Sequence, residues 1–486
     1  MSVELNERRQ QLLAGGGKDR VAKQHEAGKM TARERLGKLF DEGSFVETGV
    51  FAAGKAEASS VVTGYGTVND RPVYAYAQDF TVKAGAVGKN AADKIVRVME
   101  LAAKTGAPVV ALCDSAGANL LEGVEALDAY ARIMQETAKI SGVVPQISLI
   151  LGPCAGGAAF VPAMTDVVIV ADKAGEMYVT GPQVVSARTR RSLTAKDLGG
   201  GKKLAETGAA HIVVDTEDEA IAAARKVLDL LPGNNQEDAP LAASDDLNRQ
   251  LDIEAYADAH DLVSRVADFY DYVELSRDYA PNMVTALARL GGRTVGIVAN
   301  NPAEGEGALC AGACKKAARF VRLCDAFSVP VVTVVDTEGF VPSVSDDIAG
   351  GIREAARLAA TYADATTAKV TVLAGKAVGP VYTALAAADL RIAVTGCVVS
   401  ALEPSAAVSV LYKDEIDASD NIIAATNAKA AAYTAEVCSA ANAVACGAAD
   451  MVCDAANVRS SVVAALELLS TKRAARLPKK HGNMAL

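Results

Sequence analysis

Apolar runs alternate with amphipathic segments along most of the chain. In residues 94–108, KIVRVMELAAKTGAP, apolar positions recur every three to four residues up to a proline, which predicts a helix. The following segment, PVVALCDSAG, is a short Val-rich run ending in Asp114 and Gly117, which predicts a buried strand. This alternation is typical of an α/β protein with a largely parallel sheet.

The same succession occurs again in the second half. The helix pattern returns in residues 316–330, KAARFVRLCDAFSVP, and the next strand, PVVTVVDTEG, ends in Asp336 and Gly339. Further on, SLILGPCAGGAAFVPAMTD matches VTVLAGKAVGPVYTALAAAD, and TGAAHIVVDTEDEAIAAARKVLDLL matches CGAADMVCDAANVRSSVVAALELL. Four matching segments in one order, at nearly constant separation, indicate a duplicated domain.

The join between the copies lies in residues 231–246, which are rich in Pro, Gly, Asn and acidic residues, as a linker should be. We therefore predict two domains, residues 1–240 and 241–486. Near the start, Thr31 and Glu34 predict a capping box in a helical arm that lies outside both repeats.

Composition narrows the classes of function. The net charge of −10 over 486 residues argues against a nucleic-acid partner. The start of the chain is polar, and no long uncharged apolar run is present, so we expect neither a secretion signal nor a membrane span. Nine scattered Cys predict reduced, buried thiols in a cytoplasmic protein, and Cys310 and Cys314 lack the further ligands of a metal site.

The turn at Gly156 and Gly157 has no titratable side chain beside it. A glycine-rich strand-to-helix turn can present backbone N–H groups to a phosphate or an oxyanion, and it can equally serve close helix–strand packing. The pattern is neither GxGxxG followed by an acidic residue nor a P-loop. The second copy places Gly379 where Gly156 stands, which favours a functional role.

The segments KMTARERLGKLFDEGSFVE, GPCAGGAAFVPAMTD and KAARFVRLCDAFSVPVVTVVD resemble the acyl-CoA carboxyltransferases, the carboxyltransferase subunits of biotin-dependent carboxylases, transcarboxylase and methylmalonyl-CoA decarboxylase. The resemblance runs over nearly the whole chain. It implies two tandem crotonase-like (ClpP/crotonase) domains in a homo-hexamer. Acyl-CoA binds the N-terminal domain, and biotin binds the C-terminal domain of a neighbouring subunit.

The resemblance also implies which residues act. Backbone N–H groups at Gly156 and Gly157 hold the thioester oxygen, and Gly117 and Ala118 line the coenzyme A site. On the biotin side the corresponding catalytic positions are Gly379 and Val381, and the positions that line the cofactor site are Pro380, Tyr382 and Thr383. Because proline has no N–H, this side has lost one donor.

Other positions also depart from the family pattern. The second half differs at Glu338, Glu354, Leu402 and Glu403, which puts substrate choice and biotin handling in doubt. We expect a short-chain substrate, with propionyl- or methylmalonyl-CoA favoured, and the direction of carboxyl transfer stays open.

The chain lacks a biotinyl-lysine motif and an ATP-binding loop. Biotin must therefore come on a separate biotin carboxyl carrier protein. A biotin carboxylase or a membrane decarboxylase subunit must complete the complex.

Two alternatives remain. One is a biotin-independent crotonase-type hydratase or isomerase, for which Glu122 and Glu125 could serve as bases. The other is a structural subunit whose biotin site has decayed. A basic segment can meet coenzyme A phosphates or simply be solvated; its residues are Arg188, Arg190, Arg191, Lys196, Lys202 and Lys203. We interpret His211 as a structural polar residue.

Overall fold

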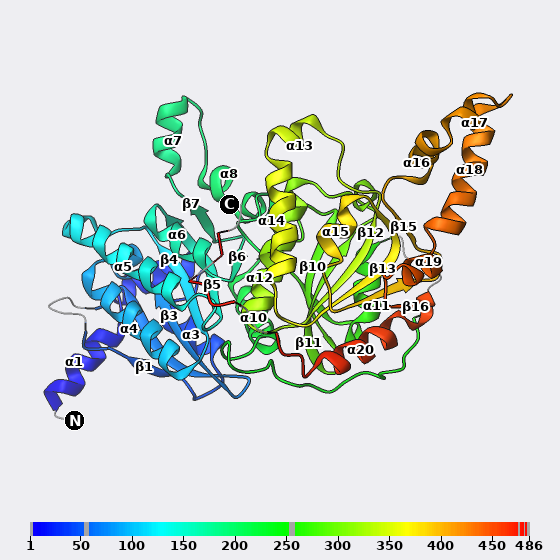
Figure 1. The fold of residues 1–486 in the computed structure, drawn as a ribbon. Coiled ribbons are helices and arrows are strands. Elements are labelled where there is room, and N and C mark those ends of the chain that lie inside the picture. The colour runs from blue at the N-terminus through cyan, green and yellow to red at the C-terminus, as the bar shows by residue number, and fades with distance from the viewer. Residues whose placement is uncertain (1–2, 53–57, 252–257, 475–476, 481, 484–486) are drawn as a thin grey trace. The chain divides into compact units, whose positions relative to one another are not determined.

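The computed structural model describes residues 3–52, 58–251, 258–474, 477–480 and 482–483. The chain divides into two compact units, Met1–Ala239 and Pro240–Leu486, which Figure 1 shows in colours from blue to green and from green to red. Each unit contains helices and one mostly parallel sheet, so the predicted α/β class is confirmed.

The described residues of the first unit form an eight-stranded sheet in the order β1-β2-β3-β4-β5-β6-β8, with β7 paired to β5. The two pairings among β1, β2 and β3 are antiparallel, and all later pairings are parallel. The strands are β1 (Val46–Thr48), β2 (Val61–Val68), β3 (Arg71–Gln78), β4 (Val109–Ser115), β5 (Gln146–Ala155), β6 (Val167–Ala171), β7 (Glu176–Tyr178) and β8 (Ile212–Val214).

Helices cover this sheet because its strands are apolar on both faces, as expected for a parallel sheet. Helix α4 packs on β2 and β3 and against α5, while α10 packs on β5 and β6 and against α3. The helices are α1 (Val3–Leu13), α2 (Lys18–Glu26), α3 (Ala32–Leu39), α4 (Lys89–Thr105), α5 (Val124–Ile140), α6 (Gly157–Met164), α7 (Pro182–Thr189), α8 (Ala195–Gly199), α9 (Gly201–Glu206) and α10 (Glu217–Leu230), with short 3-10 turns η1 (Lys83–Gly85) and η2 (Leu120–Glu122).

The second unit repeats this sheet with the order β9-β10-β11-β12-β13-β14-β16 and with β15 paired to β13. Its strands are β9 (Tyr272–Glu274), β10 (Met283–Leu290), β11 (Arg293–Asn300), β12 (Val331–Thr337), β13 (Lys369–Val378), β14 (Leu390–Val394), β15 (Val398–Ser400) and β16 (Met451–Cys453). Its helices are α11 (Ala259–Val266), α12 (Ala311–Ala326), α13 (Val344–Ile348), α14 (Gly351–Asp364), α15 (Pro380–Leu385), α16 (Pro404–Leu411), α17 (Lys413–Asp417), α18 (Ile422–Val437), α19 (Ala440–Ala445) and α20 (Val458–Leu469), with η3 (Asp268–Tyr270), η4 (Gly305–Gly307) and η5 (Ala455–Asn457).

The duplication extends to individual hydrogen bonds. The carboxylate of Asp166 accepts the N–H of Gln146 at 2.8 Å, and its own N–H donates to the Gln146 carbonyl at 2.9 Å. Asp389 makes the same two bonds with Lys369, at 2.8 and 2.9 Å. In both units an Asp just before a strand thus fixes the start of the neighbouring parallel strand through the same two hydrogen bonds. The repeat in sequence is therefore also a repeat in structure.

The end of the N-terminal arm belongs to the repeat, which corrects our expectation that the arm lies outside it. Helix α3 begins with the predicted capping box of Thr31 and Glu34, and its counterpart α11 begins at the N-cap Asp258. After the two helices, Asp41 and Asp268 pair with the arginines Arg225 and Arg459. The sequence match was missed because the two helices share little beyond their apolar face.

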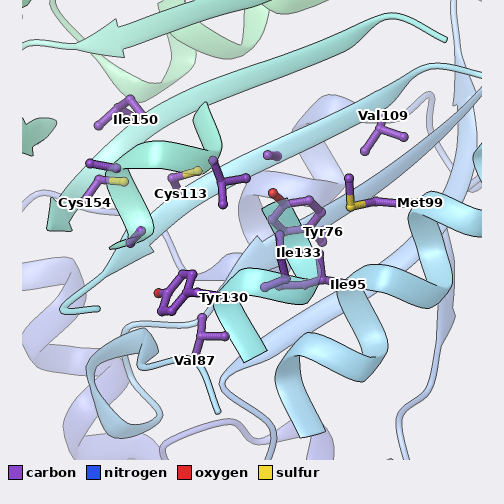
Figure 2. Close-up of a cluster of buried hydrophobic side chains, with 14 of the residues drawn as sticks. Tyr76, Val87, Ile95, Met99, Val109, Cys113, Tyr130, Ile133, Ile150 and Cys154 are labelled. Carbon is purple, nitrogen blue, oxygen red and sulfur yellow. The ribbon is translucent and has the colours of Figure 1, made fainter. Parts of the chain in front are cut away.

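A large apolar core lies between the sheet of the first unit and the helices α4, α5 and α6. Figure 2 shows part of it, with Tyr130 and Ile133 of α5 and with Cys113 and Cys154 of the strands among the labelled side chains. This core supports the end of β5, which leads directly into the glycine turn.

Candidate active site

The turn between β5 and α6 exposes two amides. Gly156 has a φ of 64°, a conformation that favours glycine, and its N–H donates to the Tyr178 carbonyl at 3.0 Å. The first helical bond is donated by Ala159 to the Gly156 carbonyl, also at 3.0 Å. The N–H groups of Gly157 and Ala158 therefore lie at the free N-terminal end of α6, where they can bind an oxyanion.

This geometry corrects one of the expected donors. The resemblance implied oxygen-holding amides at Gly156 and Gly157, but the N–H of Gly156 is already bonded to Tyr178. Gly156 instead supplies the turn conformation, while Gly157 and Ala158 carry the donors.

A second turn, between β4 and η2, supplies a further amide. The N–H of Gly117 donates to the Ser115 hydroxyl at 3.0 Å, so it is not available to a ligand. Val87 pairs with this turn by donating to the Gly117 carbonyl and by accepting the Asn119 N–H, both at 2.9 Å. In such a parallel bridge the N–H of Ala118 points away from Val87, so Ala118 rather than Gly117 presents the donor.

The two turns are neighbours. A Cβ added to Gly117 would lie 3.3 Å from the Ala155 carbonyl oxygen, and the φ of Gly117 is 108°. Beneath the turn between β5 and α6, a Cβ on Gly157 would lie 3.7 Å from the Tyr130 ring, which is ordinary van der Waals contact. Burial raises the pKa of the Tyr130 hydroxyl well above its usual value, so this floor stays neutral. The site is thus a pair of amide-bearing turns on an apolar base.

The second unit builds the same turn with one donor fewer. Gly379 has a φ of 66°, its N–H donates to the Ser400 carbonyl at 2.7 Å, and the Tyr382 N–H donates to the Gly379 carbonyl at 3.2 Å. Gly379, like Gly156, therefore sets the turn and does not donate to a ligand. Because Pro380 has no N–H, the amide left at the start of α15 is that of Val381, and the whole residue Val381 is buried.

The neighbouring turn of this unit presents Phe340. Gly339 donates its N–H to the Thr337 hydroxyl at 3.1 Å and accepts the Leu309 N–H at 2.9 Å, while the Val341 N–H donates to the Leu309 carbonyl at 2.9 Å. The Phe340 N–H then points away from Leu309, as that of Ala118 points away from Val87. Our sequence reasoning missed Phe340 as a donor, although alignment of the two repeats at their Asp-x-x-Gly segments would have found it.

The other two residues expected at the biotin site make contacts within the fold. The Tyr382 hydroxyl donates to the Ala448 carbonyl at 2.6 Å and accepts from Arg391 at 3.2 Å, so it fastens α15 to the loop before β16. The Thr383 hydroxyl is exposed and donates to the Pro380 carbonyl at 2.6 Å.

A buried ionic network holds the end of β4, and our sequence reasoning did not anticipate it. Asp114, which is fully buried, accepts a hydrogen bond from Lys29 at 2.7 Å and forms an ion pair with Arg35 at 2.9 Å, and Arg35 also pairs with Glu217 at 2.5 Å. Burial by itself would lower the pKa of Arg35, but Asp114 and Glu217 outweigh it and raise that pKa. The sequence contained a sign of this network, because Lys29 and Arg35 both lie within the segment KMTARERL.

The carboxylates considered as alternative bases are placed differently. Glu122 accepts the Lys89 N–H and the Asn119 side-chain amide, both at 2.6 Å, so it caps α4 and anchors the turn. Glu125 is exposed on the first turn of α5. Neither position supports a general base at the amide site.

In the basic segment of residues 188–203, some side chains are exposed and others bind neighbouring groups of the fold. Arg188, Arg190, Arg191 and Lys202 are exposed, whereas Lys196 donates to the Asp172 carbonyl and Lys203 pairs with Glu206. His211 accepts the Val168 N–H at 2.9 Å between neighbouring strands, which fits a structural role.

Within the described residues, no group of three or more His, Cys, Asp or Glu side chains is placed to hold a metal ion. All nine cysteines are free thiols. Cys310 caps α12 by accepting the Ala313 N–H, and burial raises the pKa of Cys314 to about 12. No helix in the described part of the chain has the length and apolar character needed to cross a membrane.

Two domains with parallel sheets, each with an amide-bearing turn where a glycine leads into a short helix, define a tandem crotonase-type α/β protein. The chain belongs to the carboxyl transferase domain family, whose pattern matches residues 23–484. It is 41% identical over 99% of its length to the methylmalonyl-CoA decarboxylase subunit alpha of Veillonella parvula, of which it covers 98%. It is 40% identical over 99% of its length to the methylmalonyl-CoA carboxyltransferase 12S subunit of Propionibacterium freudenreichii subsp. shermanii, of which it covers 96%.

A solved structure gives the same result for the fold. The transcarboxylase 12S hexamer, determined with methylmalonyl-coenzyme A and methylmalonic acid bound, superimposes with a TM-score of 0.95 at 40% identity. The match covers 99% of this chain and 97% of that one. The predicted crotonase-type fold and carboxyltransferase family are confirmed.

Proposed function

We propose that this chain is the carboxyltransferase subunit of a biotin-dependent complex that moves a carboxyl group to or from a short-chain acyl-CoA. The observation that carries the proposal is the pair of matching turns, Gly156-Gly157 and Gly379-Pro380, in a chain of the carboxyl transferase family. Substrates of the propionyl-CoA and methylmalonyl-CoA class fit best, because proteins with those names are about 40% identical over nearly the whole chain.

In the first unit the acyl-CoA thioester oxygen lies against the amides of Ala118, Gly157 and Ala158. In the decarboxylating direction the bond from Cα to the carboxyl carbon breaks, the carboxyl group passes to biotin, and the electron pair of the bond moves onto the thioester oxygen as an enolate. The enolate carbon then takes up the proton that the biotin nitrogen gives up. These N–H groups stabilise the developing negative charge, and the neutral, buried surface around Tyr130 strengthens their hydrogen bonds by excluding water. In the opposite direction the Cα–H bond would break to give the enolate, whose carbon would bond to the carboxyl carbon as the bond from that carbon to the biotin nitrogen breaks. The Cα proton would end on that nitrogen. The site therefore needs positioned amides more than a titratable side chain.

The second unit fits biotin, whose ureido group supplies the carboxyl-carrying nitrogen when it is bound. The fit rests on the amides of Val381 and Phe340, which lie where the first unit has Ala158 and Ala118. Pro380 removes the counterpart of the Gly157 amide, so the site retains fewer donors than the first. We propose that the biotin oxygen is held at this turn, with Pro380 and Thr383 at its exposed edge.

Further features of the complex follow from this proposal. Biotin arrives on a biotin carboxyl carrier protein, and a biotin carboxylase or a membrane decarboxylase subunit supplies or removes the carboxyl group. The acyl-CoA site of one chain works with the biotin site of a neighbour in a homo-hexamer. The free thiols support a reducing, cytoplasmic location. Arg188, Arg190 and Arg191 are exposed candidates for contact with coenzyme A phosphates.

Carboxyl exchange with free biotin is the deciding experiment. The purified chain is incubated with labelled malonyl-CoA or methylmalonyl-CoA and free biotin, and biotin-dependent loss of the labelled carboxyl group is measured. Exchange above the rate without protein supports the proposal. Binding of acyl-CoA with no exchange points instead to a structural subunit with a decayed biotin site, and turnover that does not depend on biotin points to a crotonase-type hydratase or isomerase.

A further inference from the structure

Helix α6 has one exposed face, and that face begins at the amide donors of the first unit. Its residues recur every three to four positions, as one face of a helix requires, and they are Gly157, Phe160, Ala163 and Met164. The remaining residues of α6 are buried. Phe160 is 45% exposed, so an aromatic side chain lies in the open about one helical turn after the Gly157 amide.

A side chain at the position of Phe160 leans toward the free amides. In a helix the Cα–Cβ bond tilts toward the N-terminus, and long side chains cover the surface of the preceding turn. Gly157 stands in that preceding turn and has no side chain that could cover its own N–H. The Phe160 ring therefore borders the space in front of the Gly157 amide.

The second unit shows the same lean in its own copy of the helix. Thr383 occupies the place of Phe160 in the repeat, and its hydroxyl donates to the Pro380 carbonyl at 2.6 Å. Because Pro380 is the counterpart of Gly157, the side chain at this position reaches back to the first residue of its helix. Phe160 brings a larger, apolar side chain to this turn.

The difference between Phe160 and Thr383 matches the two proposed ligands. The acyl carbons are bonded to the carbonyl carbon whose oxygen the amides hold, so they lie within reach of a ring beside those amides. An aromatic ring there removes apolar acyl carbon from water, which stabilises the complex. The ureido group of biotin carries N–H groups beside its oxygen, and a threonine hydroxyl can hydrogen-bond to such a ligand where a phenyl ring cannot.

We propose that Phe160 contacts the acyl chain of the bound acyl-CoA and sets the chain length that the first unit accepts. This inference rests on the proposed function, because it takes the amides of Gly157 and Ala158 as part of the thioester site. A short acyl group packs against the ring. A longer chain has to displace the ring or bend away from it, so it binds more weakly.

The test measures the binding of acetyl-, propionyl-, butyryl- and hexanoyl-CoA to the full-length chain by isothermal titration calorimetry. None of these ligands carries a carboxyl group to transfer, so binding is measured without carboxyl exchange. The variants are Phe160→Ala, which removes the ring, and Phe160→Trp, which enlarges it. Met164→Ala is the matched control, because Met164 lies one turn further along the same face of α6 and is 39% exposed.

In Phe160→Ala the affinity for hexanoyl-CoA relative to propionyl-CoA should rise at least about fourfold, the effect of burying one methylene group. In Phe160→Trp this ratio should fall, and in Met164→Ala it should equal that of the natural chain. Changes of equal size for every acyl-CoA, or no change, overturn the inference and leave the proposed function standing. If the natural chain binds none of these ligands, the proposed function fails and the inference fails with it.

Discussion

Gly157 and Pro380 occupy the same place in the two copies of one turn: each is the first residue of a short helix that follows a glycine. Those preceding glycines, Gly156 and Gly379, have φ values of 64° and 66° and donate their N–H groups to the carbonyls of the neighbouring short strands. The backbone is the same, but one copy has an N–H where the other has a proline ring. Exchanging the residue types at these two positions therefore tests what the N–H group contributes at each turn.

Gly157→Pro should remove one thioester-side donor without disturbing the fold. Proline is well tolerated at the first position of a helix, and Gly379-Pro380 shows that the preceding glycine conformation accepts it. We expect carboxyl exchange to fall about 10²–10³-fold, the usual effect of losing one oxyanion donor. Gly157→Ala keeps the N–H and directs its Cβ toward Tyr130 at contact distance, so it should retain most activity. Equal loss in both variants would show that side-chain volume, and not the amide, matters here.

Pro380→Gly should restore the missing donor on the biotin side. If nothing else fills its place, exchange with free biotin should rise tenfold or more, which corresponds to about 1.4 kcal/mol of transition-state stabilisation. Pro380→Ala also restores an N–H and should give the same direction of change, whereas the binding of acyl-CoA to the first unit should not change. Unchanged exchange in both variants would mean that another group already supplies this hydrogen bond.

Arg35→Met should strongly destabilise the first unit. Arg35 is fully buried between Asp114 and Glu217, and its removal leaves Glu217 without its paired cation and Asp114 with the Lys29 ion pair. Breaking a buried pair in this way costs about 3–5 kcal/mol. Arg33→Met is the matched control, because Arg33 pairs with Glu47 in a more exposed setting and should cost at most about 1 kcal/mol. Denaturant unfolding of both variants measures the difference, and similar midpoints would contradict the prediction.

Lys316→Met should stabilise the second unit at neutral pH. Burial lowers the pKa of Lys316 to about 8, and its ammonium nitrogen has no hydrogen-bond partner. Below pH 8 the group is charged in both the folded and unfolded states, so the folded state bears the whole cost of burying that charge. Between pH 8 and the unfolded value near 10.5 the folded chain releases its proton first, so the free energy of unfolding rises with pH.

The expected gain from Lys316→Met is about 2–3 kcal/mol at pH 7, and it should vanish above about pH 10.5. Lys94→Met is the control in the first unit. The pKa of Lys94 is also lowered to about 8 by burial, but its ammonium donates to the Val61 carbonyl at 2.5 Å, so its removal should gain less. Chemical unfolding at pH 7 and pH 10.5 tests both variants. A gain that does not depend on pH would point to packing instead of charge.

The sequence by itself determined the duplication, the α/β class and the position of the two glycine turns. These features rest on local signals: the spacing of apolar residues, the proline that follows each of the two matching helix segments, and the small residues at the ends of strands. The capping box of Thr31 and Glu34 is also a local signal, since both partners lie within one turn of helix. The missing donor at Pro380 could also be read directly, because it depends on the residue type alone.

Only the tertiary structure decided which amides are free to bind a ligand. The N–H of Gly156 is bonded to Tyr178 of β7 and that of Gly117 to Ser115, which moves the donors to Gly157, Ala158 and Ala118. Likewise, the structure brought Lys29 to Asp114. Each backbone or carboxylate group can satisfy itself with whichever partner the fold places beside it. Except for Ser115, which lies two residues before Gly117, those partners come from other elements of the chain, so local sequence cannot specify them.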